Sequence, residues 1–221
     1  MLVEIIGLAG AGKSSLLRAL KQNPEVVTHA DRLSVRKIGA LPFYLGTSLQ
    51  TAPFFLSLYQ QGCRLSREEM SRVLYVAGMH RYFRRHNQAG KPLILDQGPV
   101  FELATLYGFG PPQLHEARFQ AWWQQQFQVW AQSLDLVVWL SAAPEVLLER
   151  IRSREQRHAV KATSSDVAKE FLQRYQSAYE VVLKALATKG KPKIVQLDSS
   201  SLSVEALTAQ VGLMICGKYD K

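Results

Sequence analysis

The segment GLAGAGKS, residues 7–14, matches the pattern G-x-x-x-x-G-K-[ST] at every fixed position. The apolar run Met1–Ile6 precedes it, and the helix-forming run SSLLRALK follows it and ends at Lys21. Glycines let a backbone turn tightly and aim successive N–H groups inward, and a helix N-terminus adds partial positive charge. We therefore expect a strand, a phosphate-binding loop and a helix, in this order.

Two side chains of this loop have roles that its chemistry suggests. Lys13 can reach the β and γ phosphates of a nucleoside triphosphate, and the Ser14 hydroxyl can ligate Mg²⁺. The alternative is a glycine-rich turn without a ligand, but the strand and the helix on either side favour phosphate binding. The residues expected to contact the nucleotide in this segment are Gly7, Gly10, Ala11, Gly12, Lys13, Ser14 and Ser15.

The composition is that of an ordinary globular chain with one core. The 221 residues are 47% hydrophobic, and we expect a single domain over residues 1–221. Two cysteines cannot build a disulfide framework and suit a reducing cytosol. The formal charge of +9, from 27 basic and 18 acidic residues, favours anionic partners without choosing among nucleotides, nucleic acid and acidic lipid. Because neither a signal peptide nor an uninterrupted apolar span is evident, we expect a cytoplasmic protein.

Short apolar runs alternate with helical patterns, which predicts an α/β fold with a parallel sheet. The expected strands are Met1–Ile6, Val26–His29, Leu93–Asp96, Leu136–Leu140 and Ile194–Leu197. After the first helix, the expected helices are Arg67–Gln88, Pro112–Ser133, Pro144–Arg154, Ser165–Thr188 and Ser203–Met214. We expect the segment Ser34–Ser66 to form short helices and loops over one end of the sheet.

A carboxylate stands at the end of one expected strand. Asp96 closes the run LILD, and ligands of open α/β sheets bind beyond the carboxyl ends of the strands. Asp96 can hold Mg²⁺ there or accept a proton from an acceptor. The alternative is an N-cap for a helix that begins near Val100. Asp31 and Asp135 are weaker candidates, and Asp135 precedes its strand and so belongs to the opposite end.

Several arginines follow the fourth expected strand. Arg150 and Arg154 lie four residues apart and Arg157 three further on, which places them on one helical face. A lid over residues 150–165 that carries guanidinium groups would exclude water and neutralise charge on transferred phosphate. The alternative is a solvated helical face whose cations lie near the C-terminal end, where the helix dipole favours them.

Together these segments resemble the thymidylate kinase branch of the nucleoside monophosphate kinases, with deoxynucleoside kinases close behind. The resemblance covers nearly the whole chain. It depends on GLAGAGKSS, LILDQG, VVWLSAAPEVLLERIRSREQR, SDVAKEFLQRYQSAYEVV and IVQLDSSSLSVEALTAQV. It implies a P-loop three-layer sandwich with a five-stranded parallel sheet, ATP as phosphoryl donor, Mg²⁺, and an arginine-rich lid. Asp198 begins a segment that resembles the loop beside the nucleotide base in this family.

Three positions depart from the family pattern. Ala9 stands where the P-loop often carries an acidic residue, and Gln97 stands where an arginine usually follows the strand-end aspartate. Gly78 aligns with an arginine that grips the acceptor phosphate, and the nearest arginine is Arg81, one helical turn later. The candidate acceptor contacts are therefore Arg81, Gln97 and Arg157, within an acceptor region expected over residues 34–90.

Other signals admit two interpretations each. Arg81 belongs to a basic cluster with Arg84, Arg85 and His86. This cluster could bind an anion, or it could form the solvent-exposed C-terminal part of a helix. The aromatic residues 122, 123, 127 and 130 recur at helical spacing and are expected to pack in the core or an interface. The aromatic residues between 43 and 59 could line an acceptor pocket or pack in the core. The histidines show no metal-ligand spacing.

The residues favour an ATP-dependent phosphotransferase in which Lys13, Asp96, Arg150 and Arg154 are catalytic. The alternative is a nucleotide-dependent binding or regulatory protein with little or no kinase activity. The partners we expect are a nucleoside triphosphate and a small-molecule acceptor rather than a membrane or nucleic acid. A homodimer is one oligomeric state open to the chain.

Overall fold

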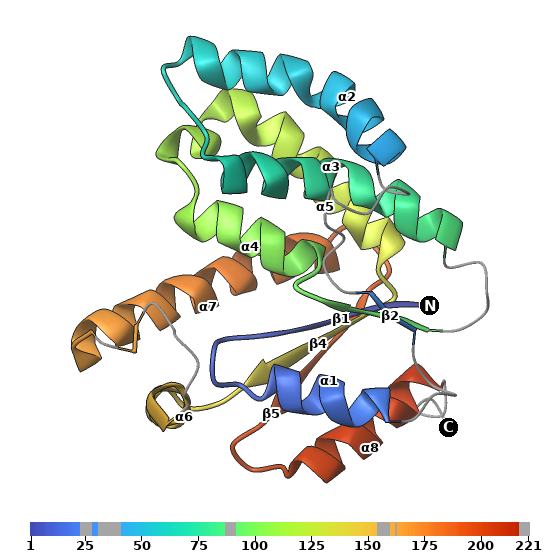
Figure 1. Ribbon diagram of the computed structural model, residues 1–221, viewed down its shortest axis with the longest axis vertical. Helices are drawn as coiled ribbons and strands as arrows, with labels where there is room; N and C mark the ends of the chain where they lie inside the picture. Colours follow the sequence, from blue (N-terminus) through green and yellow to red (C-terminus); the bar gives the residue numbers. More distant parts are fainter. Residues whose placement is uncertain (23–27, 31–40, 87–91, 154–159, 162, 217–221) are drawn as a thin grey trace.

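The computed structural model describes residues 1–22, 28–30, 41–86, 92–153, 160–161 and 163–216. Five strands form one parallel sheet in the order β2-β3-β1-β4-β5. The strands are β1 (Leu2–Gly7), β2 (Thr28–Ala30), β3 (Leu93–Asp96), β4 (Leu136–Ser141) and β5 (Lys193–Asp198). Because all five run in one direction, their carboxyl ends meet at one edge, where α/β proteins bind ligands (Figure 1).

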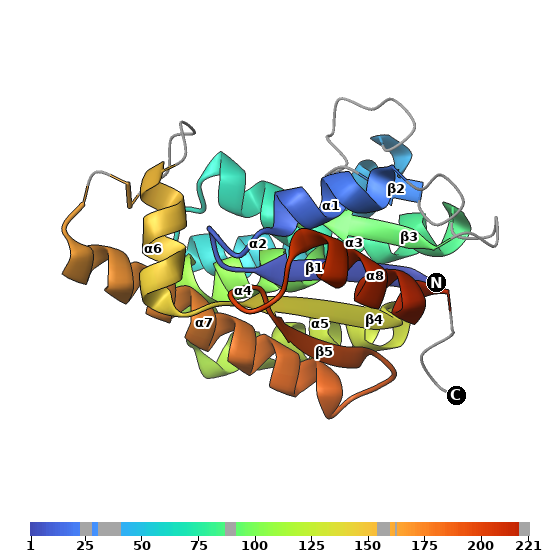
Figure 2. The ribbon, with the colours of Figure 1, turned by 90° about the horizontal axis from the view of Figure 1, so that it is seen from below.

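Helices cover both faces of the sheet, so the expected α/β class is confirmed (Figure 2). On one face lie α1 (Lys13–Lys21) and α8 (Val204–Ile215). The other face carries α3 (Arg67–His86), α4 (Pro99–Phe109), α5 (Gln120–Ser133) and α7 (Ser165–Ala187). Two further helices, α2 (Leu41–Gln60) and α6 (Pro144–Ser153), lie outside these layers.

The alternation of side chains along the central strands explains the two layers. In β1, Val3 and Ile5 pack with the α1 and α8 side, whereas Leu2 and Ile6 pack with the α3, α4 and α7 side. Successive residues of a strand point to opposite faces, so a strand covered on both sides must be apolar throughout. Glu4 is the exception within β1, and it is fully buried.

The segment 34–66 differs from its prediction. Instead of short helices and loops, residues 41–60 form one continuous helix, α2, that includes Pro53. Gly46 and Pro53 have low helix propensity, but the packing of α2 against α3 stabilises the helix (Figure 1). A serine–glutamate capping box then starts α3: Ser66 Oγ accepts from the Glu69 amide at 3.2 Å, and the Glu69 carboxylate accepts from the Ser66 amide at 2.6 Å.

The other differences are small. The predicted helix Pro112–Ser133 divides into two short 3₁₀ turns, Pro112–His115 and Ala117–Phe119, followed by α5. The aromatic residues of α5 pack in the core as expected, with Trp130 fully buried and its indole N–H donating to the Val76 carbonyl at 2.9 Å. In the part of the chain that the structure describes, none of the helices is long and apolar enough to span a membrane.

Candidate functional site

The predicted phosphate-binding loop connects β1 to α1 in a conformation that requires glycine. Gly10 and Gly12 have φ of +86° and +88°, in the left-handed region. A Cβ atom on Gly10 would also approach the Leu147 carbonyl oxygen of α6 to 2.7 Å. The loop is therefore held tightly against α6, and only glycine fits at position 10.

The loop leaves the first turn of α1 open to a ligand. Gly12 is the N-cap residue and provides no side chain to bind the helix amides. The amide of Ala11 donates to the Leu8 carbonyl at 3.1 Å, which closes the turn before the helix begins. Uncapped amides at a helix N-terminus bind anions well, because their partial charges add to those of the helix dipole.

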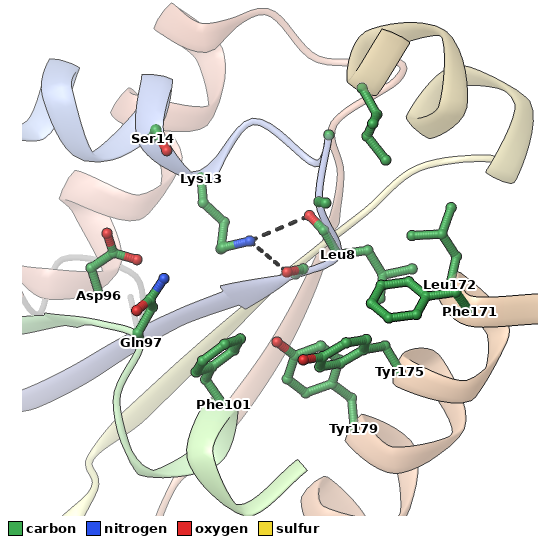
Figure 3. A pocket seen from close by; sticks show the side chains of 14 residues that line it. Leu8, Lys13, Ser14, Asp96, Gln97, Phe101, Phe171, Leu172, Tyr175 and Tyr179 are labelled. Carbon is green, nitrogen blue, oxygen red and sulfur yellow. Dashed lines mark hydrogen bonds between the residues drawn. The ribbon is translucent and has the colours of Figure 1, made fainter. Parts of the chain in front are cut away.

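The ammonium group of Lys13 lies over this loop. Its Nζ atom donates to the Gly7 carbonyl at 2.6 Å and is 3.3 Å from the Leu8 carbonyl (Figure 3). Lys13 and Ser14 both line a cavity of about 290 Å³ at the carboxyl edge of the sheet. The structure thus brings together the glycines, the ammonium and the hydroxyl that the motif predicts.

Asp96 and Gln97 line the same cavity beside Lys13 and Ser14 (Figure 3). Asp96 pairs with Ile5 in the register of β3 and β1, which places it beside the start of the loop. Among the described residues, Gln97 is the one non-glycine residue with positive φ, at 55°. Residues held in such sparsely populated backbone regions cluster at functional sites. The alternative interpretation of Asp96 as an N-cap is wrong, because α4 begins at Pro99 with Gly98 as its N-cap.

Glu4 caps the start of α4 from the neighbouring strand. Its two carboxyl oxygens accept hydrogen bonds from the amides of Val100 and Phe101, at 2.8 and 2.9 Å. Burial raises the pKa of Glu4 from 4.5 to about 8, although these hydrogen bonds lower it. Glu4 was not predicted from the sequence. The signal that could have revealed it is a single acidic residue within an otherwise apolar strand.

An aromatic wall completes the cavity. Phe101 of α4 and three residues of α7 line it: Phe171, Tyr175 and Tyr179. The rings of Phe101 and Tyr175 are parallel within 11°, with centroids 6.4 Å apart. Sequence reasoning also missed this wall. The spacing of four residues along α7 indicated a shared helical face, but not that this face meets the phosphate-binding loop.

Behind the aromatic wall, α3 and α4 are joined by a buried ion pair. Arg72 bonds the carboxylate of Glu102, which is fully buried, and also the exposed Glu68. The guanidinium carbon of Arg72 lies 5.7 Å from the centroid of the Phe101 ring. Arg72 is thus the α3 arginine beside the cavity wall.

Arg81, the arginine predicted to bind the acceptor, lies elsewhere. It lines a separate hollow of about 140 Å³ between α2, α3 and α5, together with Phe54 and Trp122. The N-terminal part of α3 approaches the carboxyl edge of the sheet, and Arg81 lies in the C-terminal part (Figure 1). The structure does not bring Arg81 together with the phosphate-binding loop.

Arg150 connects the phosphate-binding loop to the segment after β5. One guanidinium nitrogen lies 3.4 Å from the Gly10 carbonyl and 3.3 Å from Ser199 Oγ, and the other donates to the Ser199 carbonyl at 3.0 Å. Arg154 and Arg157 lie outside the described residues, so the expected lid over 150–165 is not shown. Asp166, in the first turn of α7, is exposed.

Asp198 lines a neighbouring hollow of about 530 Å³ at the carboxyl ends of β4 and β5. Hydrogen bonds from the hydroxyl and amide of Ser200 lower the pKa of Asp198. Leu8 lines both this hollow and the cavity, so the two adjoin at the phosphate-binding loop. Asp135 lies at the opposite edge as predicted, where its carboxylate accepts from the Leu2 amide at 2.6 Å.

The oxygen groups of the cavity fit a magnesium ion. Mg²⁺ prefers hydroxyl, carboxylate and phosphate oxygens and retains several waters. The hydroxyl of Ser14 is exposed and the carboxylate of Asp96 is partly exposed, and both line the cavity with the open amides of α1. These groups could hold the ion together with a bound polyphosphate.

The fold and the loop define a P-loop protein, and comparison with known proteins agrees. A family model described as an AAA domain matches residues 2–182. The chain belongs to this family. No curated protein sequence matches it.

Solved structures with the same fold include nucleotide complexes. Deoxyadenosine kinase from M. mycoides with bound dATP has a TM-score of 0.55 and 13% identity, over 98% of this chain and 100% of that one. YorR protein from Bacillus subtilis, in complex with phosphorylated GDP, has a TM-score of 0.53 and 14% identity, over 100% of this chain and 99% of that one. At these identities the likeness establishes that the chain shares the fold of these two proteins.

Proposed function

We propose that this protein transfers the γ-phosphoryl group of ATP, bound with Mg²⁺, to a small acceptor. One observation carries the proposal: the phosphate-binding loop, Asp96 with Gln97, and an aromatic wall line the same cavity. Phosphoryl transfer requires little more than alignment of donor and acceptor and stabilisation of charge on the transferred group. A cavity with a phosphate site on one side and an aromatic wall on the other suits the alignment of a donor and an acceptor.

The donor would lie on the loop side. Amides of the first turn of α1 and the Lys13 ammonium would neutralise charge on the β and γ phosphates. Ser14 and Asp96 would hold Mg²⁺, which when bound neutralises charge on the phosphate oxygens. The base of the donor would extend toward the hollow beside Asp198. Arg150 would lie at its side, where it joins the phosphate-binding loop to the segment after β5. Arg154 and Arg157 remain candidate contacts to the phosphates and the acceptor.

The acceptor would lie between Gln97 and the aromatic wall. Among the described lining residues of the cavity, Lys13 is the one cation and Asp96 the one anion. This favours an acceptor with a neutral hydroxyl and a planar ring, such as a nucleoside, over one that already carries a phosphate. The acceptor oxygen would bond to the γ phosphorus as the bond to the β-phosphate oxygen breaks, and the hydroxyl proton would pass to an oxygen of the transferred phosphoryl group.

The test is phosphoryl transfer from Mg·[γ-³²P]ATP to matched panels of nucleosides and nucleoside monophosphates. We expect labelled product with a nucleoside, and a loss on the order of a hundredfold or more in Lys13→Ala. Lys21→Ala is the matched control, because Lys21 is exposed at the other end of the same helix. Circular dichroism of both variants would separate lost chemistry from lost folding.

Three outcomes decide the proposal. Unchanged activity in folded Lys13→Ala would overturn the role of the loop. Transfer only to monophosphates would overturn the neutral acceptor. Calorimetric binding of ATP without transfer to any compound would favour the nucleotide-dependent regulatory protein, which the position of Arg81 away from the cavity also suits.

A further inference from the structure

Helix α2 carries no charged residue in its 20 positions, LPFYLGTSLQTAPFFLSLYQ. The whole chain has a formal charge of +9, so an uncharged helix of this length is unlike the rest of its surface. In this fold, α2 is the outermost element beside α3 (Figure 1).

One face of α2 is buried and the opposite face is not. Thr47, Thr51 and Leu58 face the protein and are 2%, 6% and 1% exposed. On the other side, Leu45, Leu49, Leu56 and Tyr59 are 60%, 79%, 57% and 64% exposed. These four are among the large hydrophobic side chains that the described chain leaves most open to solvent, and all belong to this one helix.

The exposed residues form a straight line. With the exposed Ala52 between them, they follow one another at intervals of four, three, four and three residues. This is the spacing of positions a and d in helices that pack side by side. We call these five residues, Leu45, Leu49, Ala52, Leu56 and Tyr59, the α2 stripe.

A second copy of the chain fits the stripe better than a lipid surface does. Helices that lie on membranes carry lysine or arginine beside their apolar face to meet anionic headgroups, and α2 has none. Two copies that each carry +9 repel one another, so self-association needs a patch without charge. A two-fold interface must also be complementary to itself, and the stripe is nearly symmetric about the small side chain of Ala52.

We propose that the α2 stripe is the contact face of a homodimer in which two α2 helices pack antiparallel. The two-fold axis passes Ala52, so that Ala52 meets its equivalent and the backbones approach closely. Leu49 then packs against the partner subunit's Leu56, and Leu45 against the partner subunit's Tyr59. A standard interface buries about 800 Å² per partner, more than one helical stripe supplies, so the dimer should dissociate on dilution.

The first test is sedimentation velocity across a range of protein concentrations. We expect a monomer–dimer equilibrium in the wild type, and association at least roughly tenfold weaker in Leu49→Lys, because the lysine must be desolvated at the centre of the interface. The matched control is Leu213→Lys, at a leucine that is 45% exposed on α8. Added salt should strengthen the dimer, since it screens the repulsion between basic subunits.

The second test determines the pairing. Leu56→Glu should weaken association as Leu49→Lys does, but a mixture of the two variants should form a heterodimer. In the antiparallel arrangement the new lysine of one chain faces the new glutamate of the other, whereas parallel helices would place them apart. With Cys216→Ser as background, Ala52→Cys should form an intermolecular disulfide on oxidation and Gln50→Cys, on the side of the helix, should not.

Several outcomes would overturn the proposal. These are a wild type that stays monomeric at high concentration, a Leu49→Lys variant that dimerises normally, and variants that fail to recombine. Binding to vesicles of neutral phosphatidylcholine tests whether the stripe contacts lipid instead. Binding to them that Leu49→Lys abolishes in an otherwise monomeric protein would assign the stripe to lipid instead.

Discussion

The carboxyl group of Glu4, in the centre of β1, accepts a hydrogen bond of 2.8 Å from the amide of Val100 in the first turn of α4. A Cβ atom on Gly98 would lie 2.7 Å from the Glu4 carboxyl carbon, so glycine at the N-cap makes this approach feasible. The neighbouring amide of Phe101 donates to the other oxygen of the same carboxyl group, and Phe101 lines the cavity. Glu4 thereby fixes one wall of the candidate site to the strand that leads into the phosphate-binding loop.

The buried Glu4 should make stability depend on pH. Its pKa is about 8 in the folded chain, against the ordinary value of 4.5 that we expect in the unfolded chain. Between these values the folded chain retains a proton that the unfolded chain releases, so the free energy of unfolding falls as the pH rises, by roughly 5 kcal/mol in total. Above about pH 8 both states are ionised and this dependence ends. Urea denaturation at intervals across this pH range measures it.

Glu4→Gln should flatten this dependence, because the amide does not ionise. Glu180→Gln, at an exposed position of α7, is the control and should keep the slope of the wild type. If the curves of the wild type and Glu4→Gln stay parallel over the whole range, the ionisation of Glu4 is not coupled to folding.

The fold could be predicted from the sequence because its signals are local. The phosphate-binding segment gives the order of the first strand and helix, and LILD and LVVWL are apolar enough to be covered strands. Helix α2 was missed because Gly46 and Pro53 weaken the helical signal, and its contacts with α3 outweigh that weakness.

Only part of the candidate site could be predicted, because the rest depends on contacts between segments that are distant in the sequence. The residues of the loop and Asp96 follow from short motifs, whereas the aromatic wall joins Phe101 and Tyr175, which are distant in the sequence. Phe101 and Tyr175 lie side by side only because α7 packs against α4. Likewise, spacing along α3 drew attention to Arg81, but the direction of this helix brings Arg72 to the site instead.

Gln97 should be strained in the native state. Its φ of 55° costs an L-residue with a side chain roughly 1 kcal/mol, which glycine avoids. Gln97→Gly should therefore raise the free energy of unfolding by up to about 1 kcal/mol while weakening acceptor use, since the amide group lines the cavity. Gln22→Gly, at an exposed residue with φ of −71°, should lose stability. Equal losses in the two variants would show that Gln97 is not strained.

The ion pair of Arg72 and Glu102 should be strongly coupled. Arg72→Met leaves a fully buried carboxylate without this cation, and we expect a loss of about 3–5 kcal/mol of stability. Glu68→Gln removes the exposed partner of the same arginine and should cost less than about 1 kcal/mol. The double variant Arg72→Met/Glu102→Leu should recover much of the loss. Additive losses in a double-mutant cycle measured by denaturation would contradict this coupling.

Gly10→Ala should separate nucleotide binding from folding. The methyl group would meet the Leu147 carbonyl of α6 at 2.7 Å, and φ of +86° is unfavourable for alanine by roughly 1–2 kcal/mol. The loop must then shift, and the amides that face the cavity lose the alignment on which phosphate binding depends. Isothermal titration calorimetry should therefore show a large loss of affinity for Mg·ATP while circular dichroism stays native. Gly212→Ala is the matched control, because a Cβ atom there meets nothing within 4 Å and alanine favours the helix α8. Wild-type affinity in Gly10→Ala would mean that the nucleotide does not depend on the geometry of this loop, and the proposed donor site would have to be abandoned.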